Sequence, residues 1–392
     1  MLKINVVRKN DYGFNLLGSK ALKLMDKETP PVDLLIRESV QNSADATRTD
    51  KKGCKICFDK GEFNNAVFAN KIEMVGSQLI KIFGKGQQQY LCISDTYTTG
   101  LLGEPYETPN KPNNLYKLVY SFLESGKDGD SGGSWGVGKT VYYRFGKGLV
   151  FYYSQTFEDG RRCQKLAGAI IEDEKGLDPL LKEEKHSTGI AFFGKNAIGK
   201  INNEVRSVPI EDENEIRDFL SIFGIQTFKE NETGTKVIIP FFEDNSICSE
   251  RMIDDNPPWD GDFDQCISQS IQRWYFPRIN NPEFGKYIVA FVNGKKVELN
   301  PFFKKLQELY NGELEGAGKL EIEKAGFDKP LGVFRYKLFK KDELGVLTRP
   351  ENLPSPYVHL DIKEENQEDE NEAIVFYMRK PGMIINYDQS KT

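Results

Sequence analysis

The chain has 392 residues, 39% of them hydrophobic and 29% charged, a length typical of two domains and a balance typical of a globular protein with a sizeable core. No apolar run approaches the roughly 18 residues that cross a bilayer, the start lacks the apolar stretch of a signal peptide, and six cysteines are too few for a disulfide scaffold. The net charge of -6 argues against a general coating of nucleic acid, although not against a local basic patch, so we expect a cytoplasmic protein with no membrane partner.

The first element with a clear pattern is a helix over residues 31–46, which begins at the second of the two prolines that follow Thr29. Its residues form two stripes on roughly opposite sides: an apolar one of Ile36, Val40 and Ala44, and a polar one of Glu38, Asn42 and Asp45. The helix can therefore pack one side on a sheet while the other side faces a site.

Strand patterns and one further helix follow along the chain. We predict strands at 54–59, 89–95, 148–155, 162–173, 188–194 and 234–242, and an amphipathic helix at 211–225. Residues 101–131 differ, because they are rich in Gly, Pro, Asn and Lys around one predicted helix over 113–125. We expect this segment to be a mobile lid.

The composition loosens after Phe242, and DDNPPWDGDFD is the best candidate for a domain boundary, so we begin the second unit after residue 243. Beyond it we predict a helix at 265–276 and strands at 286–297, 332–340 and 373–380. The predicted fold class is α+β: a sandwich of a mixed sheet and helices over residues 1–243, followed by a smaller α/β unit over residues 244–392.

Two side chains on the polar side of the first helix suggest chemistry on a phosphate. Glu38 and Asn42 are one turn apart. A carboxylate can deprotonate an attacking water, and an amide oxygen is a ligand for a hard cation such as Mg²⁺. An exposed polar helix face without a ligand is the alternative interpretation.

Three more motifs suit a nucleotide. Asp95 ends a strand before a turn closed by Gly100, and a carboxylate there accepts from the exocyclic amine of adenine. GGSWGVGKT offers backbone N–H groups and Lys139 to an anion, and a helix that we expect after the glycines adds its N-terminal dipole. Thr235 opens a buried strand and can place a hydroxyl near the base.

Together and in this order, the four motifs resemble those of the GHKL ATPases, the superfamily of the gyrase B subunit, the ninety-kilodalton heat-shock chaperone, histidine kinases and MutL. RESVQNSADA resembles the N-box, D-T-x-x-x-G the first glycine box, G-S-W-G-V-G the second, and G-T-K-V-I-I the last. The resemblance covers roughly residues 30–242 and is closest to the chaperone, gyrase and MutL type. It implies a Bergerat fold over residues 1–243, with a transducer-like domain over residues 244–392.

The resemblance also implies roles for single residues. Glu38 would be the general base, Asn42 the Mg²⁺ ligand, and Asp95 the reader of adenine, supported by Thr235. The other nucleotide contacts would come from Asp45, Ala46, Gly100, Gly133, Gly136, Val137, Gly138, Lys139 and Thr140. The implied cofactors are ATP and Mg²⁺.

The sequence departs from the family pattern at two positions. Tyr97 replaces the first glycine of the usual D-x-G-x-G, so the loop beside adenine can differ in shape. Lys139 stands where the chaperones carry an apolar residue, and we expect it to contact the terminal phosphates.

A P-loop is the rival interpretation, because Gly133 to Thr140 also spells G-x-x-x-x-G-K-T. A P-loop needs a buried strand directly before it, and the preceding residues are polar and rich in glycine. Its acidic partner would be Glu172 or Asp173. This interpretation leaves the helix over residues 31–46 without a role.

A histidine kinase is disfavoured, because about thirty residues without a histidine precede the N-box. We expect an ATPase whose cycle drives a conformational change or homodimerisation, as a subunit of a larger bacterial machine such as an anti-phage defence system. Its partners would be a protein subunit and, through a local basic surface, DNA. Arg379 or Lys380 would reach the γ-phosphate. The alternatives are a chaperone-like ATPase that acts on client proteins and a non-hydrolysing ATP-binding module.

Overall fold

The computed structural model describes most of the chain and centres on a mixed sheet. The described residues are 1–9, 17–23, 31–108, 111–121, 138–182, 184–198, 205–243, 262–322, 332–337, 372–378 and 382–391. Ten strands form the sheet in the order β1-β6-β5-β4-β8-β3-β2-β9-β10, with β7 paired to β6. Their bounds are β1 Lys3–Arg8, β2 Gly53–Asn64, β3 Gln87–Thr96, β4 Leu149–Glu158, β5 Arg161–Ile171, β6 Ser187–Ile198, β7 Val205–Val208, β8 Gly234–Pro240, β9 Tyr287–Val292 and β10 Lys295–Lys296.

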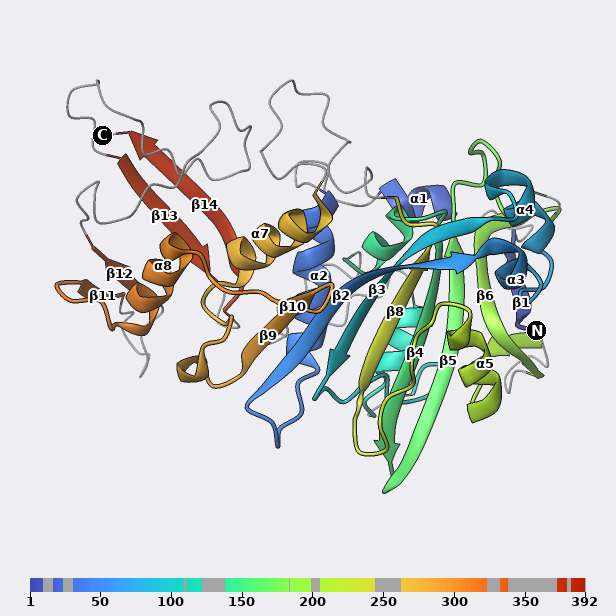
Figure 1. Ribbon diagram of the computed structural model, residues 1–392, viewed down its shortest axis with the longest axis horizontal. Helices are drawn as coiled ribbons and strands as arrows, with labels where there is room; N and C mark the ends of the chain where they lie inside the picture. The colour runs from blue at the N-terminus through green and yellow to red at the C-terminus, as the bar shows by residue number, and fades with distance from the viewer. Residues whose placement is uncertain are drawn as a thin grey trace.

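Helices cover both faces of this sheet (Figure 1). One face packs against α1 Gly18–Lys23, α2 Pro31–Asp45, α7 Phe263–Tyr275 and the 3₁₀ helix η2 Gly138–Arg144. The other face packs against α3 Asn65–Ala69, α4 Gly76–Phe83 and α5 Glu213–Ser221. The side chains along β4 show why both faces need covering. Val150 and Tyr152 belong to the first core, and Phe151 and Tyr153 belong to the second, because successive side chains of a strand point to opposite faces.

Most of the remaining described elements lie toward the β10 end of the sheet (Figure 1). They are η3 Pro282–Phe284, α8 Pro301–Asn311 and two small antiparallel pairs, β11 Gly318–Ile322 with β12 Gly332–Tyr336 and β13 Glu372–Met378 with β14 Ile384–Lys391. The side chain of Asn300 caps the start of α8 by accepting from the N–H of Phe303, and Gly312 ends the helix at a φ of 79°.

The predicted α+β class, a mixed sheet covered by helices, is confirmed. The pairing is mixed because β2 and β9 run parallel while β2 and β3 run antiparallel. The boundary after residue 243 stays a prediction: residues 244–261 lie outside the described residues, and β9 and β10, which follow them, join the main sheet.

Two predicted helices differ in the structure. The helix expected over 113–125 is a π-helix over Tyr116–Tyr120, and residues 122–130 lie outside the described part. The helix expected after the glycine motif is η2, whose tighter 3₁₀ winding continues to Arg144.

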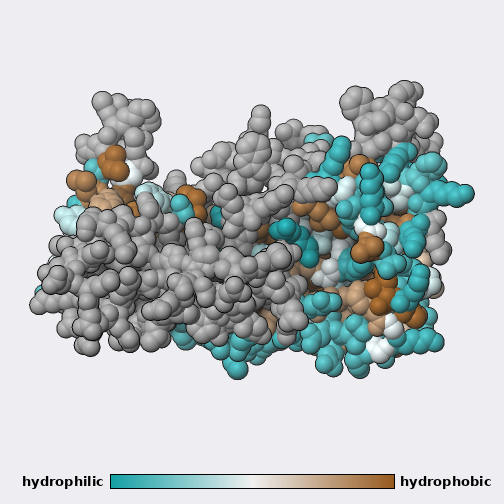
Figure 2. Space-filling view, turned by 90° about the horizontal axis from the view of Figure 1, so that it is seen from above, coloured by the Kyte–Doolittle hydropathy of each residue, from teal (hydrophilic) through white to brown (hydrophobic). Residues whose placement is uncertain are grey.

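The surface seen in Figure 2 mixes hydrophilic and hydrophobic residues. On the end of the molecule that carries β1 and α4, hydrophilic residues predominate among the described ones, with hydrophobic residues between them. Within the described residues, every helix is too short or too polar to cross a bilayer.

Candidate functional site

The helix α2 presents its polar side to solvent and buries the other. Leu35, Ile36 and Val40 are fully buried in the core of the sheet face that α2 covers. On the polar side Glu38 is half-buried, and Asn42 and Asp45 are exposed. The helix therefore holds two carboxylates and an amide at an accessible position on a rigid support.

Burial dominates the electrostatics of Glu38. It raises the pKa of this carboxyl above the ordinary 4.5, an effect that the charge of Arg37 opposes and that of Asp45 reinforces. No described residue donates a hydrogen bond to the Glu38 carboxylate. A carboxylate with a raised pKa and unoccupied oxygens is suited to accept a proton.

The surrounding protein also raises the pKa of Asp45, although its side chain is open to solvent. A hydrogen bond from Gln41 and the charges of Arg278 and Lys286 oppose this shift. The two cations come from the chain after residue 262, and the Lys286 ammonium donates to the carbonyl of Thr47 at 3.3 Å. Segments from both sides of the predicted boundary thus meet at the end of α2.

Among the described residues, the Asn42 side chain has one hydrogen-bond partner. Its Nδ2 donates to the hydroxyl of Tyr142 at 3.3 Å, and within the described part of the chain no donor reaches its Oδ1. Burial raises the pKa of Tyr142, which the carboxylates of Glu38 and Asp95 raise further. Tyr142 therefore lies within electrostatic reach of the other polar groups of this site.

Asp95, near the end of β3, accepts three hydrogen bonds from the described residues. The Ser43 hydroxyl donates to Oδ2 at 2.9 Å, while the Thr98 hydroxyl and the N–H of Thr235, at 3.0 Å, both donate to Oδ1. Burial nevertheless raises the pKa of this carboxyl, and the three bonds oppose the shift. A carboxylate offers about four lone pairs, so one acceptor position on Oδ2 is left for a ligand.

The turn after Asp95 is strained at Tyr97, the position where the GHKL motif has glycine. Tyr97 has a φ of 67°, a conformation that glycine adopts at much lower cost. Backbone bonds fix it to the end of α2: the N–H of Arg48 donates to the Tyr97 carbonyl at 3.0 Å, and the N–H of Thr99 to that of Ala46 at 2.8 Å. The departure at Tyr97 therefore keeps a tight turn.

Gly100 closes this turn where the chain passes directly against β4. Its φ is 68°, and a Cβ there would lie 2.7 Å from the Ser154 hydroxyl oxygen and 2.8 Å from the Gln155 carbonyl. Any side chain at this position would displace the turn, so the site requires glycine for backbone packing.

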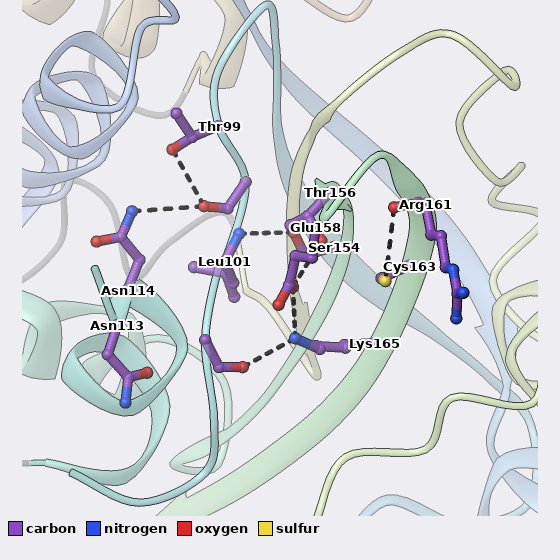
Figure 3. A network of polar contacts seen from close by, with 12 residues as sticks. Thr99, Leu101, Asn113, Asn114, Ser154, Thr156, Glu158, Arg161, Cys163 and Lys165 are labelled. Atoms are coloured by element: carbon purple, nitrogen blue, oxygen red, sulfur yellow. Dashed lines mark hydrogen bonds and ion pairs between the residues drawn. The ribbon is translucent and has the colours of Figure 1, made fainter. Parts of the chain in front are cut away.

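The predicted lid starts as a well-anchored segment (Figure 3). The N–H of Leu101 donates to the Ser154 hydroxyl at 2.8 Å. The buried ammonium of Lys165 donates to the Gly103 carbonyl at 2.8 Å and pairs with Glu158 at 2.6 Å. These contacts attach the first residues after Gly100 to β4 and β5.

The glycine motif is described only at its end. Gly133, Gly136 and Val137 lie outside the described residues, as do Arg379 and Lys380. The backbone of Gly138 and Lys139 begins η2, and Thr140 is fully buried. The described structure thus brings Glu38, Asn42, Asp45, Ala46, Asp95, Gly100 and Thr235 into one region around α2 and the end of β3.

Three contributors were not predicted from the sequence: Ser43, Thr98 and Tyr142. Ser43 and Thr98 lie within two of the motifs, and their hydroxyl groups were the feature of the sequence that could have identified them as hydrogen-bond donors. Nothing in the sequence around Tyr142 distinguishes it from a core aromatic.

The P-loop interpretation loses one of its two acidic candidates. The buried carboxylate of Glu172 accepts the N–H groups of Leu180 at 2.6 Å and Leu181 at 2.9 Å, and it thereby holds a turn. The winding after Gly138 is 3₁₀ rather than the α-helix of a P-loop.

The oxygen atoms of this site suit a hard cation that takes few ligands from the protein and most of them from water and phosphate. Among the described residues, no three His, Cys, Asp or Glu side chains gather as a metal site. Mg²⁺ needs no such cluster, because it is usually held by one or two protein oxygens with water and substrate phosphates. The free Oδ1 of Asn42 fits this role.

Neither a protein-family model nor a curated protein matches the sequence. Among solved structures, the chain is similar to the ATPase region of topoisomerase II from Saccharomyces cerevisiae, with 11% identity and a TM-score of 0.34 over 75% of this chain. It is also similar to the ATPase and transducer domains of DNA topoisomerase II from Balamuthia mandrillaris, with 13% identity and a TM-score of 0.34 over 74% of this chain. These matches cover 55% and 53% of the two chains, so this chain spans about half of their length.

Proposed function

We propose that this protein is a Mg²⁺-dependent ATPase of the GHKL type. The observation that carries the proposal is the bond between α2 and β3: Ser43 on the helix donates to Asp95 on the strand, which joins a base-reading carboxylate to the helix that bears Glu38 and Asn42. The proposal depends on this chain's own residues, since the likeness to the solved structures is distant.

Asp95 selects adenine in this proposal. Its three protein donors leave one acceptor position on Oδ2, and adenine presents an amine there while guanine presents a carbonyl oxygen. A carbonyl oxygen against a carboxylate would leave two acceptors facing each other, so guanine is rejected. Burial of the carboxyl strengthens this discrimination.

Asn42 and Glu38 act on the phosphates. The Asn42 oxygen holds Mg²⁺, which supplies charge neutralisation on the phosphate oxygens when it is bound. Glu38 orients a water and accepts its proton, for which its unoccupied carboxylate and raised pKa are suited. The glycine motif and Lys139 complete the phosphate contacts in this proposal.

We further propose a wider setting for this activity. In it, ATP binding drives a conformational change or the association of two protomers, a protein subunit or DNA is the partner, and the whole is a bacterial machine such as an anti-phage defence system. In the same setting, the side chain of Arg379 or Lys380 contacts the γ-phosphate.

A single experiment tests the core of the proposal. We expect Glu38→Gln to lower the turnover of ATP by about 100-fold to 10,000-fold, because the general base is lost. The affinity for ATP, measured by calorimetry, should change little, since Gln keeps the shape of the side chain. Glu298→Gln is the matched control, because this carboxylate is 66% exposed, follows the last strand of the sheet and pairs with Lys296, and it should leave turnover unchanged.

The outcomes separate the alternatives. Equal turnover of Glu38→Gln and the natural protein would refute the role of Glu38. ATP binding without turnover by the natural protein would favour a non-hydrolysing module. Stimulation of turnover by unfolded protein would favour a chaperone-like ATPase. Salt-sensitive stimulation of turnover by DNA would favour an ATPase that acts with DNA.

A further inference from the structure

The hydroxyl of Tyr142 is placed to set the orientation of the Asn42 amide. Tyr142 lies in η2, and its ring is 2% exposed within the core that α2 shares with the sheet. Its hydroxyl accepts a hydrogen bond from Asn42 Nδ2 at 3.3 Å. A buried hydroxyl on a fixed ring thus meets one end of an otherwise exposed amide.

The orientation of this amide decides whether Asn42 can hold a cation. An Asn side chain carries an acceptor oxygen on one side and a donor NH₂ on the other, and a half-turn about its terminal torsion exchanges them. The oxygen attracts Mg²⁺, whereas the NH₂ group repels it. In the described part of the chain, Tyr142 provides the only hydrogen bond to the Asn42 side chain.

We infer that Tyr142 is a positioning residue, which engages Nδ2 of Asn42 so that Oδ1 faces the metal position. This inference rests on the proposed function, because it assigns Asn42 to Mg²⁺. An outer residue that orients a metal ligand in this way lowers the reorganisation needed on binding.

The connection along the chain gives the arrangement a second consequence. η2 begins at Gly138, the last glycine of the glycine-rich motif, and Tyr142 follows one turn later. The segment that begins at the phosphate motif therefore also fixes the metal ligand. A shift of η2 would move both together.

The neighbouring Tyr143 provides a matched control. It is equally buried, and its hydroxyl accepts a bond at 3.1 Å from Tyr152, which lies on β4. Removing either hydroxyl leaves a phenylalanine of nearly the same shape, so the two variants differ mainly in which partner is lost.

The experiment compares ATP affinity with Mg²⁺ and in excess chelator, by calorimetry on the full chain. We expect Tyr142→Phe to leave the affinity for metal-free ATP unchanged and to reduce the gain from Mg²⁺ by about tenfold, the effect of losing an outer-shell partner of a metal ligand. Tyr143→Phe should change neither value. Thermal melting of both variants identifies any general loss of folding.

The results distinguish this inference from the proposed function. Tyr142→Phe with the natural gain from Mg²⁺ overturns the inference, and so does a larger gain, which would mean that the hydroxyl donates to Oδ1. If Asn42→Ala loses the gain while Tyr142→Phe keeps it, the metal ligand stands and only the role of Tyr142 fails. Absence of ATP binding by the natural protein overturns both.

Discussion

Glu38 and Asp45 lie two turns apart on α2, and the surroundings raise the pKa of both. Burial is the largest cause in each case, because the charged form of a carboxyl loses hydration near protein. Nearby cations act in the opposite direction: Arg37 lowers the pKa of Glu38, and Arg278 and Lys286 lower that of Asp45. Glu38 is the group whose protonation matters for catalysis, because it is the proposed base.

We predict that the turnover of ATP falls at acidic pH through the titration of Glu38. The base must be deprotonated, and its pKa in the free protein lies above 4.5, so the acid limb of kcat/KM should have its midpoint above 4.5. Arg37→Gln removes a charge that lowers this pKa, so the midpoint should move to higher pH. Measured profiles of kcat/KM against pH check both points. A midpoint at or below 4.5, or a downward shift in Arg37→Gln, would contradict the assignment.

At the scale of elements, α2 is held between the sheet and α7. Asp33 at its start is 1% exposed, accepts from the Ser270 hydroxyl at 2.6 Å and pairs with Arg273 at 3.6 Å. The Tyr275 hydroxyl donates to the carbonyl of Arg37 at 2.5 Å. The helix that carries the site residues is therefore fixed by a helix that follows the predicted domain boundary.

We predict that Arg273→Met destabilises the protein by about 3–5 kcal/mol, because it leaves the buried carboxylate of Asp33 without its cation. Adding Asp33→Asn removes the unpaired charge and should restore part of the loss. Urea unfolding measures the free energies. Lys295→Met is the control: it breaks a pair with Asp264 in which the lysine is 82% exposed, and it should cost less than about 1 kcal/mol. Similar losses in the two single variants would show that burial does not govern the Asp33 pair.

The sequence predicted those parts of the structure that depend on neighbouring residues. Periodicity of 3.6 located α2, and alternation or continuous apolar runs located β3, β4 and β8. Ser43 and Thr98 lie within three residues of Asn42 or Asp95, so the motifs contained them, but their partners depended on the turn at Tyr97.

Contacts between distant segments were not predictable in this way. β2 and β9 pair in parallel across more than two hundred residues, with Ile56 opposite Ala290, and no local pattern encodes that register. The loosened composition after residue 243 indicated a boundary, yet it carries no information on which strand follows it into the sheet. The contact between Tyr142 and Asn42 was not predictable for the same reason, because packing of η2 on α2 brings together residues a hundred positions apart.

At the scale of the whole molecule, the chain after residue 262 completes the main core. Ile271 and Trp274 of α7 and Ile288 and Ala290 of β9 are buried in the same core as α2. Without β9, the strand β2 would become an edge with unpaired backbone groups over Gly53 to Phe58. The ATP-binding unit proposed over residues 1–243 would therefore lack one side of its hydrophobic core.

We predict that a chain of residues 1–243 unfolds at a lower temperature than the full chain, or aggregates, and that it binds ATP weakly. A chain of residues 1–322 keeps α7, β9 and α8 and should retain ATP binding, because the described contacts of α2 with α7 remain. Thermal melting and calorimetry with ATP measure the two properties. If residues 1–243 alone melt at the same temperature as the full chain and bind ATP with the same affinity, α7 and β9 are dispensable to the site. The contacts of α2 with the later chain would then have no effect on nucleotide binding.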